Sequence, residues 1–266
     1  IICSGNYVQR GAPAVFDKSY RASAAISGGA DAVFELPCYY STASAELFAR
    51  ASVKFLIDLN CIDYICFGCE SDNLKMLPVI ASVLSKEPEE YKKYLNEFLK
   101  SGISFPKARL QAIVKYCNYN CFFNEYDITM MMSQPNNILA IEYLKALFHF
   151  KSNIKPVAVK RSGAGYNSLD TDTDFASATG IRNELLQNKN IDKYIPFSSR
   201  NILKNTRPLF YEDFSSVLGH NLLKSNVFEE YHGISQDLSN RIKNYVSKYT
   251  DCLLYTSPSP RDGATS

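Results

Sequence analysis

Histidine is scarce in this sequence. Its 266 residues include three histidines, which are widely separated at His149, His220 and His232. Serine and cysteine hydrolases need a histidine beside the nucleophile, and helical zinc sites of metalloproteases need two histidines four residues apart. Neither arrangement occurs, and the glycine patterns of the P-loop and the dinucleotide-binding fold are also absent. These absences exclude several large enzyme classes that are recognised by short motifs.

Long apolar runs and a strong charge of either sign are absent too. No apolar run approaches the roughly 20 residues of a membrane span, so we expect a cytoplasmic protein without a membrane partner. Hydrophobic residues make up 46% and charged residues 21%, which is ordinary for a soluble globular protein. The net charge of +2 permits nucleic-acid binding but does not argue for it.

The eight cysteines leave two interpretations open. The spacings Cys66–Cys69 and Cys117–Cys121 resemble half of a zinc site, but no compact second pair follows either of them. Reduced, buried thiols are the alternative that we favour. The alternating aspartates of Asp170–Asp174 lack the glycine and terminal glutamate of a calcium loop, so we interpret them as a polar loop. We therefore expect no metal site built from protein side chains alone.

Apolar runs and helical periodicity alternate along the chain. The expected strands cover residues 1–3, 32–36, 62–67 and 154–160. The expected helices cover residues 17–27, 43–59, 74–84, 87–99, 106–116, 138–150 and 176–187. This order predicts an α/β protein with a parallel sheet and helices on both faces.

Composition also suggests how the chain divides. Residues 1–196 carry the α/β pattern, whereas residues 197–251 contain two further helical segments and form a small helical domain. Residues 252–266 (CLLYTSPSPRDGATS) show neither periodicity. Part of this segment resembles a translated sequencing adapter, so we exclude 252–266 from the interpretation of the fold.

Three loops follow expected strands directly: Ser4–Gly11, Gly68–Glu70 and Ser162–Gly165. In open parallel sheets, ligands bind beyond the carboxyl ends of the strands, so we expect these loops to meet at one site. Gly68 would let a ligand approach the backbone closely because it has no side chain.

The segment Ala176–Arg182 opens a helix with small and hydroxyl residues. Ser177 and Thr179 leave backbone N–H groups uncovered, and the helix dipole favours an anion there. Arg161 and Arg182 add guanidinium groups that suit phosphate. The alternative is an ordinary helix capped by Ser177 or Thr179. Together with the strand-end loops, these residues favour a domain that binds a nucleoside triphosphate.

Several stretches of the sequence, taken in order, are similar to one known family. They are Cys3–Ala14 (CSGNYVQRGAPA), Asp17–Lys18, Glu35–Pro37, Phe67–Glu70, Pro135–Leu139, Lys160–Tyr166, Ala176–Arg182 and Leu238–Ile242. In these stretches the chain resembles the tRNA(Met) cytidine acetate ligases, and the resemblance extends from residue 1 to about residue 250.

The resemblance implies a nucleotidyltransferase-like fold of the HIGH superfamily. It also implies a reaction in which ATP, with Mg²⁺, activates acetate as acetyl-adenylate, after which the wobble cytidine of elongator tRNA(Met) is acetylated. DNA is not expected as a partner. The residues that the resemblance assigns to ATP are Gly68, Asn137, Arg161, Ser177, Thr179 and Arg182. Asn137 has a simpler alternative interpretation, because Pro135 and the asparagines beside it are ordinary helix-start signals.

The sequence departs from the family pattern at two places. Cys69 stands where the family has serine, and the first strand and histidine motif that would precede Ile1 are absent. In this superfamily the histidine pair stabilises charge on the phosphates, so the catalytic residues stay unassigned here. We expect the chain as given to catalyse adenylation weakly.

The expected RNA contacts are Arg200, Lys204 and Arg207. Arg241, Lys243 and Lys248 on the last helical segment are further candidates, and solvated surface charges are the alternative for all of them. Two other functions stay open: a small-molecule adenylyltransferase of the same fold, and a non-catalytic protein that binds RNA or nucleotide.

Overall fold

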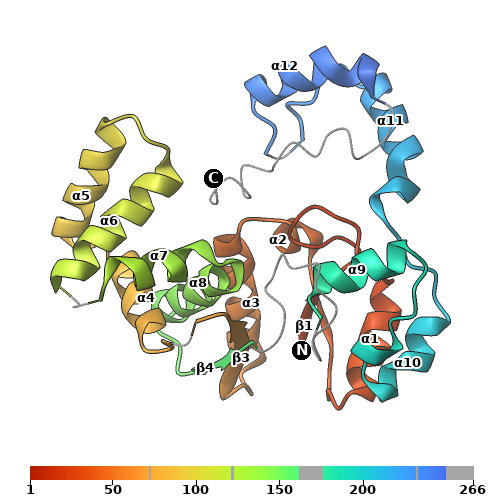
Figure 1. Cartoon of the computed structure of the whole chain (residues 1–266), viewed down its shortest axis with the longest axis horizontal. Helices are drawn as coiled ribbons and strands as arrows, with labels where there is room; N and C mark the ends of the chain where they lie inside the picture. The colour runs from red at the N-terminus through yellow and green to blue at the C-terminus, as the bar shows by residue number, and fades with distance from the viewer. Residues whose placement is uncertain (72, 121–122, 162–175, 232, 250–266) are drawn as a thin grey trace.

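The computed structural model describes residues 1–249 apart from 72, 121–122, 162–175 and 232, and the expected tail at 252–266 lies outside this part (Figure 1). Its strands are β1 (Ile2–Ser4), β2 (Phe34–Leu36), β3 (Tyr64–Cys69) and β4 (Lys155–Lys160). Both β1 with β2 and β3 with β4 pair in parallel, as the α/β pattern predicts. Within the described residues they form two separate two-stranded sheets, where the sequence suggested one continuous sheet.

The helices follow the expected order closely. Those before residue 121 are α1 (Lys18–Ser27), α2 (Cys38–Ser41), α3 (Ala45–Leu59), α4 (Met76–Lys86), α5 (Glu89–Lys100) and α6 (Phe105–Asn120). Those after it are α7 (Glu125–Ser133), α8 (Pro135–His149), α9 (Ala178–Leu186), α10 (Phe197–Lys204), α11 (Ser215–Lys224) and α12 (Gln236–Tyr245). Short 3₁₀ segments lie at Asp192–Tyr194, Tyr211–Phe214 and Val246–Lys248.

Local capping explains where several helices begin and end. The side chain of Asp17 accepts a hydrogen bond from Ser19 N and caps α1, and Ser44 caps α3 by accepting one from Leu47 N. At the other end of α3, Asn60 adopts the left-handed conformation with φ 51°, which ends the helix. These side chains satisfy backbone groups that a helix end leaves without partners.

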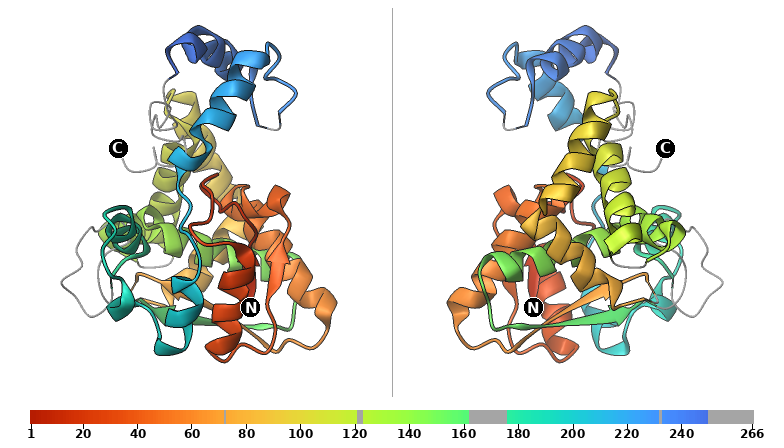
Figure 2. Two further views of the ribbon diagram at one scale, coloured as in Figure 1. Left: turned by 90° about the vertical axis from the view of Figure 1, so that its right-hand side faces the viewer. Right: turned by 90° about the vertical axis from the view of Figure 1, so that its left-hand side faces the viewer.

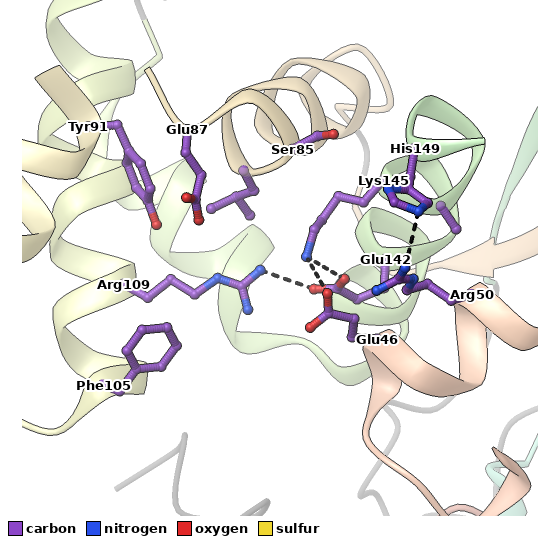
Figure 3. A pocket seen from close by; sticks show the side chains of 12 residues that line it. Glu46, Arg50, Ser85, Glu87, Tyr91, Phe105, Arg109, Glu142, Lys145 and His149 are labelled. Atoms are coloured by element: carbon purple, nitrogen blue, oxygen red, sulfur yellow. Dashed lines mark hydrogen bonds and ion pairs between the residues drawn. The ribbon is translucent and has the colours of Figure 1, made fainter. Parts of the chain in front are cut away.

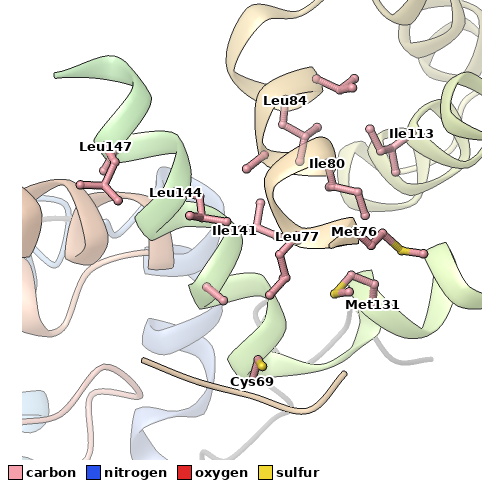
Figure 4. Close-up of a cluster of buried hydrophobic side chains, with 14 of the residues drawn as sticks. Cys69, Met76, Leu77, Ile80, Leu84, Ile113, Met131, Ile141, Leu144 and Leu147 are labelled. Carbon is pink, nitrogen blue, oxygen red and sulfur yellow. The ribbon is translucent and has the colours of Figure 1, made fainter. Parts of the chain in front are cut away.

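The main core lies between α4 and α8 and packs against one face of β3 (Figure 4). Ile80 on α4 and Ile141 on α8 are at most 1% exposed, and Met131 from α7 completes the cluster. Burial of each such aliphatic side chain stabilises the fold by about 1.5–3 kcal/mol. This core fixes the positions of β3 and α8, the two elements that lead into the candidate site.

Burial alternates along β3. Ile65, Phe67 and Cys69 are buried, and the Phe67 ring stacks on Tyr143 of α8 with centroids 5.5 Å apart. Cys66 and Gly68 are exposed on the opposite face. Among the described residues, helices therefore cover one face of this strand pair, whereas the sequence suggested cover on both.

Helix α10 and the residues that follow it contact the N-terminal part of the chain. Helix α10 packs on α1, and Ser199 Oγ donates a hydrogen bond to Ala24 O at 3.3 Å. Leu209 N further donates to Val15 O at 2.7 Å. Residues 197–209 thus lie against the N-terminal part, and the domain boundary near residue 197 stays a prediction. The mixture of arginine, asparagine and proline concealed this helix in the sequence.

Helices α11 and α12 form a small unit at one end of the molecule, away from both strand pairs (Figures 1 and 2). Few of their side chains are buried. Phe228 is 3% exposed and is the large apolar residue that anchors the connection between them. Tyr249 Oη donates to Ser215 O at 2.9 Å and ties the end of the described chain back to α11.

No helix in the described part of the chain is both long and apolar enough to cross a membrane.

Candidate functional site

The pairing of β3 with β4 brings Gly68 and Arg161 together. Gly68 lies opposite Val159 and Cys69 opposite Lys160. Arg161 N extends the ladder by donating to Cys69 O at 2.8 Å. Two residues that are more than 90 positions apart in the chain are therefore held side by side at the carboxyl ends of their strands.

Gly68 leaves open surface next to the Arg161 side chain. Gly68 is exposed, and a Cβ atom placed on it would lie 3.4 Å from Arg161 Cγ. A side chain here would cover the backbone and crowd the arginine stem. The glycine thus keeps both the strand backbone and the guanidinium group accessible to a ligand.

Asn137 and Glu70 join the end of β3 to the start of α8 by reciprocal hydrogen bonds. Asn137 Oδ1 accepts from Glu70 N at 2.8 Å and from Ser71 N at 3.3 Å. In return, the Glu70 carboxylate accepts from Asn137 N at 2.9 Å and from Asn136 N at 3.3 Å. It also accepts a short hydrogen bond from the Asn136 side chain. A carboxylate is favourable at this position because it meets the positive end of the helix dipole.

This arrangement sets the orientation of the Asn137 amide. Its oxygen must face the two backbone N–H donors, so the assignment of oxygen and nitrogen follows from the hydrogen bonds. The side chain is 1% exposed, and Nδ2 donates no hydrogen bond to any residue in the described part. Asn137 is thus a preoriented donor. The helix-start interpretation of Asn137 is incomplete, since the carboxylate that caps the first turn belongs to Glu70.

The residues at the start of α9 form a second group. Ser177 is 1% exposed and caps α9 by accepting from Gly180 N at 2.9 Å. Arg182 Nη2 donates to Thr179 Oγ1 at 3.1 Å, one turn along the helix. The capped-helix interpretation of Ser177 is therefore correct, and it does not preclude a phosphate role for the other N–H groups. The loop Ser162–Gly165 and the run Asp170–Asp174 lie outside the described residues.

Arg21 holds the first strand-end loop in place. Its guanidinium group donates to Ser4 O at 3.0 Å, to Phe16 O at 2.8 Å and, by a short contact, to Gly5 O. Because the planar guanidinium group of Arg21 donates to three carbonyl oxygens, it fixes the backbone after β1.

Glu35 of β2 lies directly against this loop. A Cβ atom on Gly5 would come within 2.1 Å of Glu35 Oε1, so any side chain at this position would displace the carboxylate. Lys18 pairs with the same carboxylate at 2.7 Å. The sequence singled out the stretches Asp17–Lys18 and Glu35–Pro37, but no local pattern indicated that these side chains meet.

The cysteines of β3 do not converge. Cys66 is exposed on one face, whereas Cys69 is buried on the other, where burial raises the pKa of its thiol. In the described residues no group of three histidine, cysteine or acidic side chains is placed to hold a metal ion.

The cations proposed for RNA each have a partner within the protein. Lys204 pairs with Asp192 at 2.7 Å, and its hydrogen bond holds the pKa of Asp192 below the ordinary value. Arg207 forms a close ion pair with Asp213, and Arg200 Nε donates to Ile195 O at 3.2 Å. The Arg207 side chain is still 79% exposed, so the ion pair leaves most of its surface open.

The cations of the last helical segment differ among themselves. Lys243 pairs with Glu229 at 3.2 Å, whereas Arg241 is exposed on α12 and Lys248 ends the last 3₁₀ segment. The pKa of Glu229 is lowered to about 2. The main cause is a hydrogen bond from the backbone N–H of Glu229, and hydrogen bonds from side chains that include Lys243 add to it.

Comparison with known proteins gives one consistent result. The sequence profile described as HIGH Nucleotidyl Transferase matches residues 1–255. A tRNA(Met) cytidine acetate ligase of Thermoanaerobacter sp. (strain X514) is 41% identical over 255 residues, which cover 93% of this chain and 62% of that protein. One from Clostridium kluyveri (strain NBRC 12016) is 39% identical over 266 residues, covering 96% and 65% respectively.

Solved structures of Thermotoga maritima TmcAL are similar to this fold. The apo form superposes with a TM-score of 0.85 at 33% identity and covers 94% of this chain and 61% of that one. A second form, bound with alpha-thio ATP, gives a TM-score of 0.84 at 33% identity. The chain thus spans a little over three fifths of the length of these relatives.

The clamp between Glu70 and α8 predicts a measurable loss of stability. Glu70→Ala leaves two backbone N–H groups and the Asn136 amide without their acceptor, so the free energy of unfolding should fall by about 1–3 kcal/mol. Glu89→Ala is the control, because Glu89 is 92% exposed in its pair with Lys92 and should change stability by no more than about 0.5 kcal/mol. Urea unfolding measures both. Equal effects of the two substitutions would contradict the importance of the clamp.

Proposed function

The chain belongs to the HIGH nucleotidyl transferase family, and we propose that it is the ATP-binding part of a tRNA-modifying ligase. In this proposal ATP activates acetate as acetyl-adenylate, and the acetyl group then passes to the wobble cytidine of elongator tRNA(Met). The observation that carries the proposal is the 41% identity over 93% of the chain to a tRNA(Met) cytidine acetate ligase. The site residues Gly68, Asn137 and Arg161 also meet at one strand end, as an ATP-binding role requires.

The described residues can supply binding and charge stabilisation. In the first step a carboxylate oxygen of acetate attacks the α-phosphorus of ATP, and the bond to the leaving pyrophosphate breaks. Arg161 beside the open backbone of Gly68 would hold phosphate oxygens as charge develops on them. Asn137 Nδ2 would donate to an acceptor on the nucleotide. In the second step the cytidine amine attacks the acetyl carbonyl and AMP leaves.

Mg²⁺ would enter with the nucleotide. The Glu70 carboxylate is engaged by the start of α8, and the described part offers no ligand cluster of its own. Mg²⁺ commonly binds through substrate phosphates and only one or two carboxylates, so the phosphates of ATP would hold it here. The ion would then neutralise charge on the leaving pyrophosphate.

Exposed cations of the C-terminal part would guide the tRNA. Arg207 and Arg241 offer open guanidinium groups, and Lys204 and Lys243 could exchange their carboxylate partners for phosphates. Ion pairs at exposed sites contribute only about 0–1 kcal/mol, so such an exchange costs little.

The proposed role of Arg161 predicts a defect in ATP use. Arg161→Ala should weaken ATP binding by this chain. When the strand and histidine motif that the family resemblance implies are joined to Ile1, the same substitution should slow acetate-dependent ATP–pyrophosphate exchange by about 10²–10³-fold. Lys54→Ala, which removes an exposed cation of α3, is the control and should leave exchange unchanged.

Other outcomes would favour the rival functions. Exchange that requires a phosphate-bearing small molecule in place of acetate would indicate a small-molecule adenylyltransferase. ATP binding without exchange under any condition would indicate a non-catalytic nucleotide-binding protein.

The orientation of Asn137 predicts the effect of a nearly isosteric change. Asn137→Asp keeps an oxygen for Glu70 N and Ser71 N but removes the Nδ2 donor, so ATP affinity should fall about tenfold. Asn136→Asp is the matched control, since it also places a second carboxylate next to Glu70, and its own amide is already used by Glu70. Calorimetric titration with ATP, at a temperature where both variants are folded, measures the difference. Equal reductions in the two variants would assign the effect to charge repulsion.

The RNA proposal predicts a change in salt dependence. Replacing Arg200, Lys204 and Arg207 together with alanine should flatten the slope of log affinity against log salt for elongator tRNA(Met). The slope should change by about 0.7–0.9 for each phosphate that these side chains neutralise in the complex. A triple substitution of the exposed Lys54, Lys86 and Lys100 is the control for net charge. If both triple variants shift the slope equally, the first three cations make no specific contact.

A further inference from the structure

A pocket lies apart from the strand-end site. It has a volume of about 260 Å³ and is bounded by α3, α4, α5, α6 and α8 (Figure 3). Its α8 residues begin at Glu142, five positions beyond Asn137 and hence about 7 Å further along the helix. The function proposed above uses none of the residues that line it.

Three charged side chains form the floor of this pocket. The Glu142 side chain is 4% exposed and binds two cations, Arg109 Nη2 at 3.0 Å and Lys145 Nζ at 2.6 Å. A buried carboxylate needs such partners, and truncation of one partner is strongly destabilising. Two cations for one carboxylate leave an excess of one positive charge at the floor.

The acids at the rim offset this excess only weakly. Glu46 Oε1 lies 3.9 Å from Lys145 Nζ, but the Glu46 side chain is 55% exposed and screened by solvent. Glu87 lines the pocket beside the Tyr91 hydroxyl (Figure 3). With these carboxylates nearby, the pocket favours a ligand of low negative charge over a triphosphate.

Tyr91 contributes a hydroxyl group to the wall of the pocket, close to both Arg109 and Glu87 (Figure 3). The residue is 1% exposed, packs edge-on against Tyr116 and directs its oxygen toward Arg109, which can only donate to it (Figure 3). Burial raises the pKa of Tyr91 by more than Arg109 lowers it, so the group stays a protonated donor at neutral pH. A protonated hydroxyl that lines the pocket in this way can donate a hydrogen bond to a ligand there.

We propose that this pocket binds a small oxyanion, either a carboxylate or inorganic phosphate, between Arg109, Lys145 and the Tyr91 hydroxyl. The guanidinium group of Arg109 has N–H donors beyond the one used by Glu142, and Lys145 has a third. The Tyr91 hydroxyl supplies a neutral donor from the opposite wall. Phe105 and Leu84 complete the lining with apolar surface that would cover the ligand from water.

Tyr91→Phe separates this proposal from a purely structural role. The link between α6 and α8 needs Arg109 and Glu142, whereas it does not need the tyrosine hydroxyl. Removing that oxygen keeps the ring and its contact with Tyr116. Tyr94→Phe is the matched control on the same helix, because the Tyr94 hydroxyl donates to Glu90 Oε1 at 3.0 Å and does not line the pocket.

The test titrates the whole chain with sodium phosphate and, separately, with sodium acetate at constant ionic strength. Calorimetry and the thermal unfolding midpoint are the readouts. We expect saturable binding of at least one anion, weakened about tenfold by Tyr91→Phe and unchanged by Tyr94→Phe. The anion that shows this pattern identifies the ligand class.

Two results would overturn the proposal: no saturable binding of either anion, or binding that Tyr91→Phe leaves unchanged. If acetate binds at the strand-end site instead, Tyr91→Phe will leave its binding unchanged, because Tyr91 does not reach that site. This outcome would also contradict the proposal. ATP binding should be equal in both tyrosine variants, so a failure of the ATP proposal would be seen separately.

Discussion

The reciprocal hydrogen bonds between Glu70 and Asn137 are the constraint on which the candidate site depends. A strand ends and a helix begins at the same point, and each leaves backbone groups without partners. Asn137 accepts from the strand end, and Glu70 accepts from the helix start. Each side chain therefore satisfies the other element's backbone, and the α4–α8 core holds both elements behind it. The pairing of β3 with β4 then fixes the positions of Gly68 and Arg161 relative to this junction.

The sequence was sufficient to predict most local structure because apolar spacing and capping residues act over a few positions. All four strands and the long helices α1, α3 and α8 lie within a few residues of their expected bounds. The division into two strand pairs was not predictable, since register and pairing depend on the whole fold. Helix α10 was missed for a related reason: its stability comes from packing on α1, and its own residues carry weak helix signals.

The site was predicted unevenly for physical reasons. Gly68 and Arg161 were expected directly after strands, and the rule for parallel sheets placed them at the same edge. In the structure Gly68 lies near the end of β3 and is held beside Arg161. The role of Glu70 could not be predicted, because its partners are more than 60 positions away and a lone glutamate has no local signature. The phosphate contacts of the cations near residue 200 stay a prediction. The pairing of Lys204 with Asp192 and of Arg207 with Asp213 had no signal in the sequence. The hydrophobic periodicity of a sequence does not indicate which charged side chains form ion pairs.

The same junction has a consequence for how this fold can diverge. Glu70 and Asn137 are 67 positions apart, so their hydrogen bonds close a loop that holds α4, α5, α6 and α7. The entropy of closing a loop grows slowly with its length, by about 0.6 kcal/mol for each doubling. Residues can thus be inserted at the tip of the α5–α6 hairpin without moving the strand end. The hairpin is a place where evolution can add new contacts while the candidate site keeps its geometry.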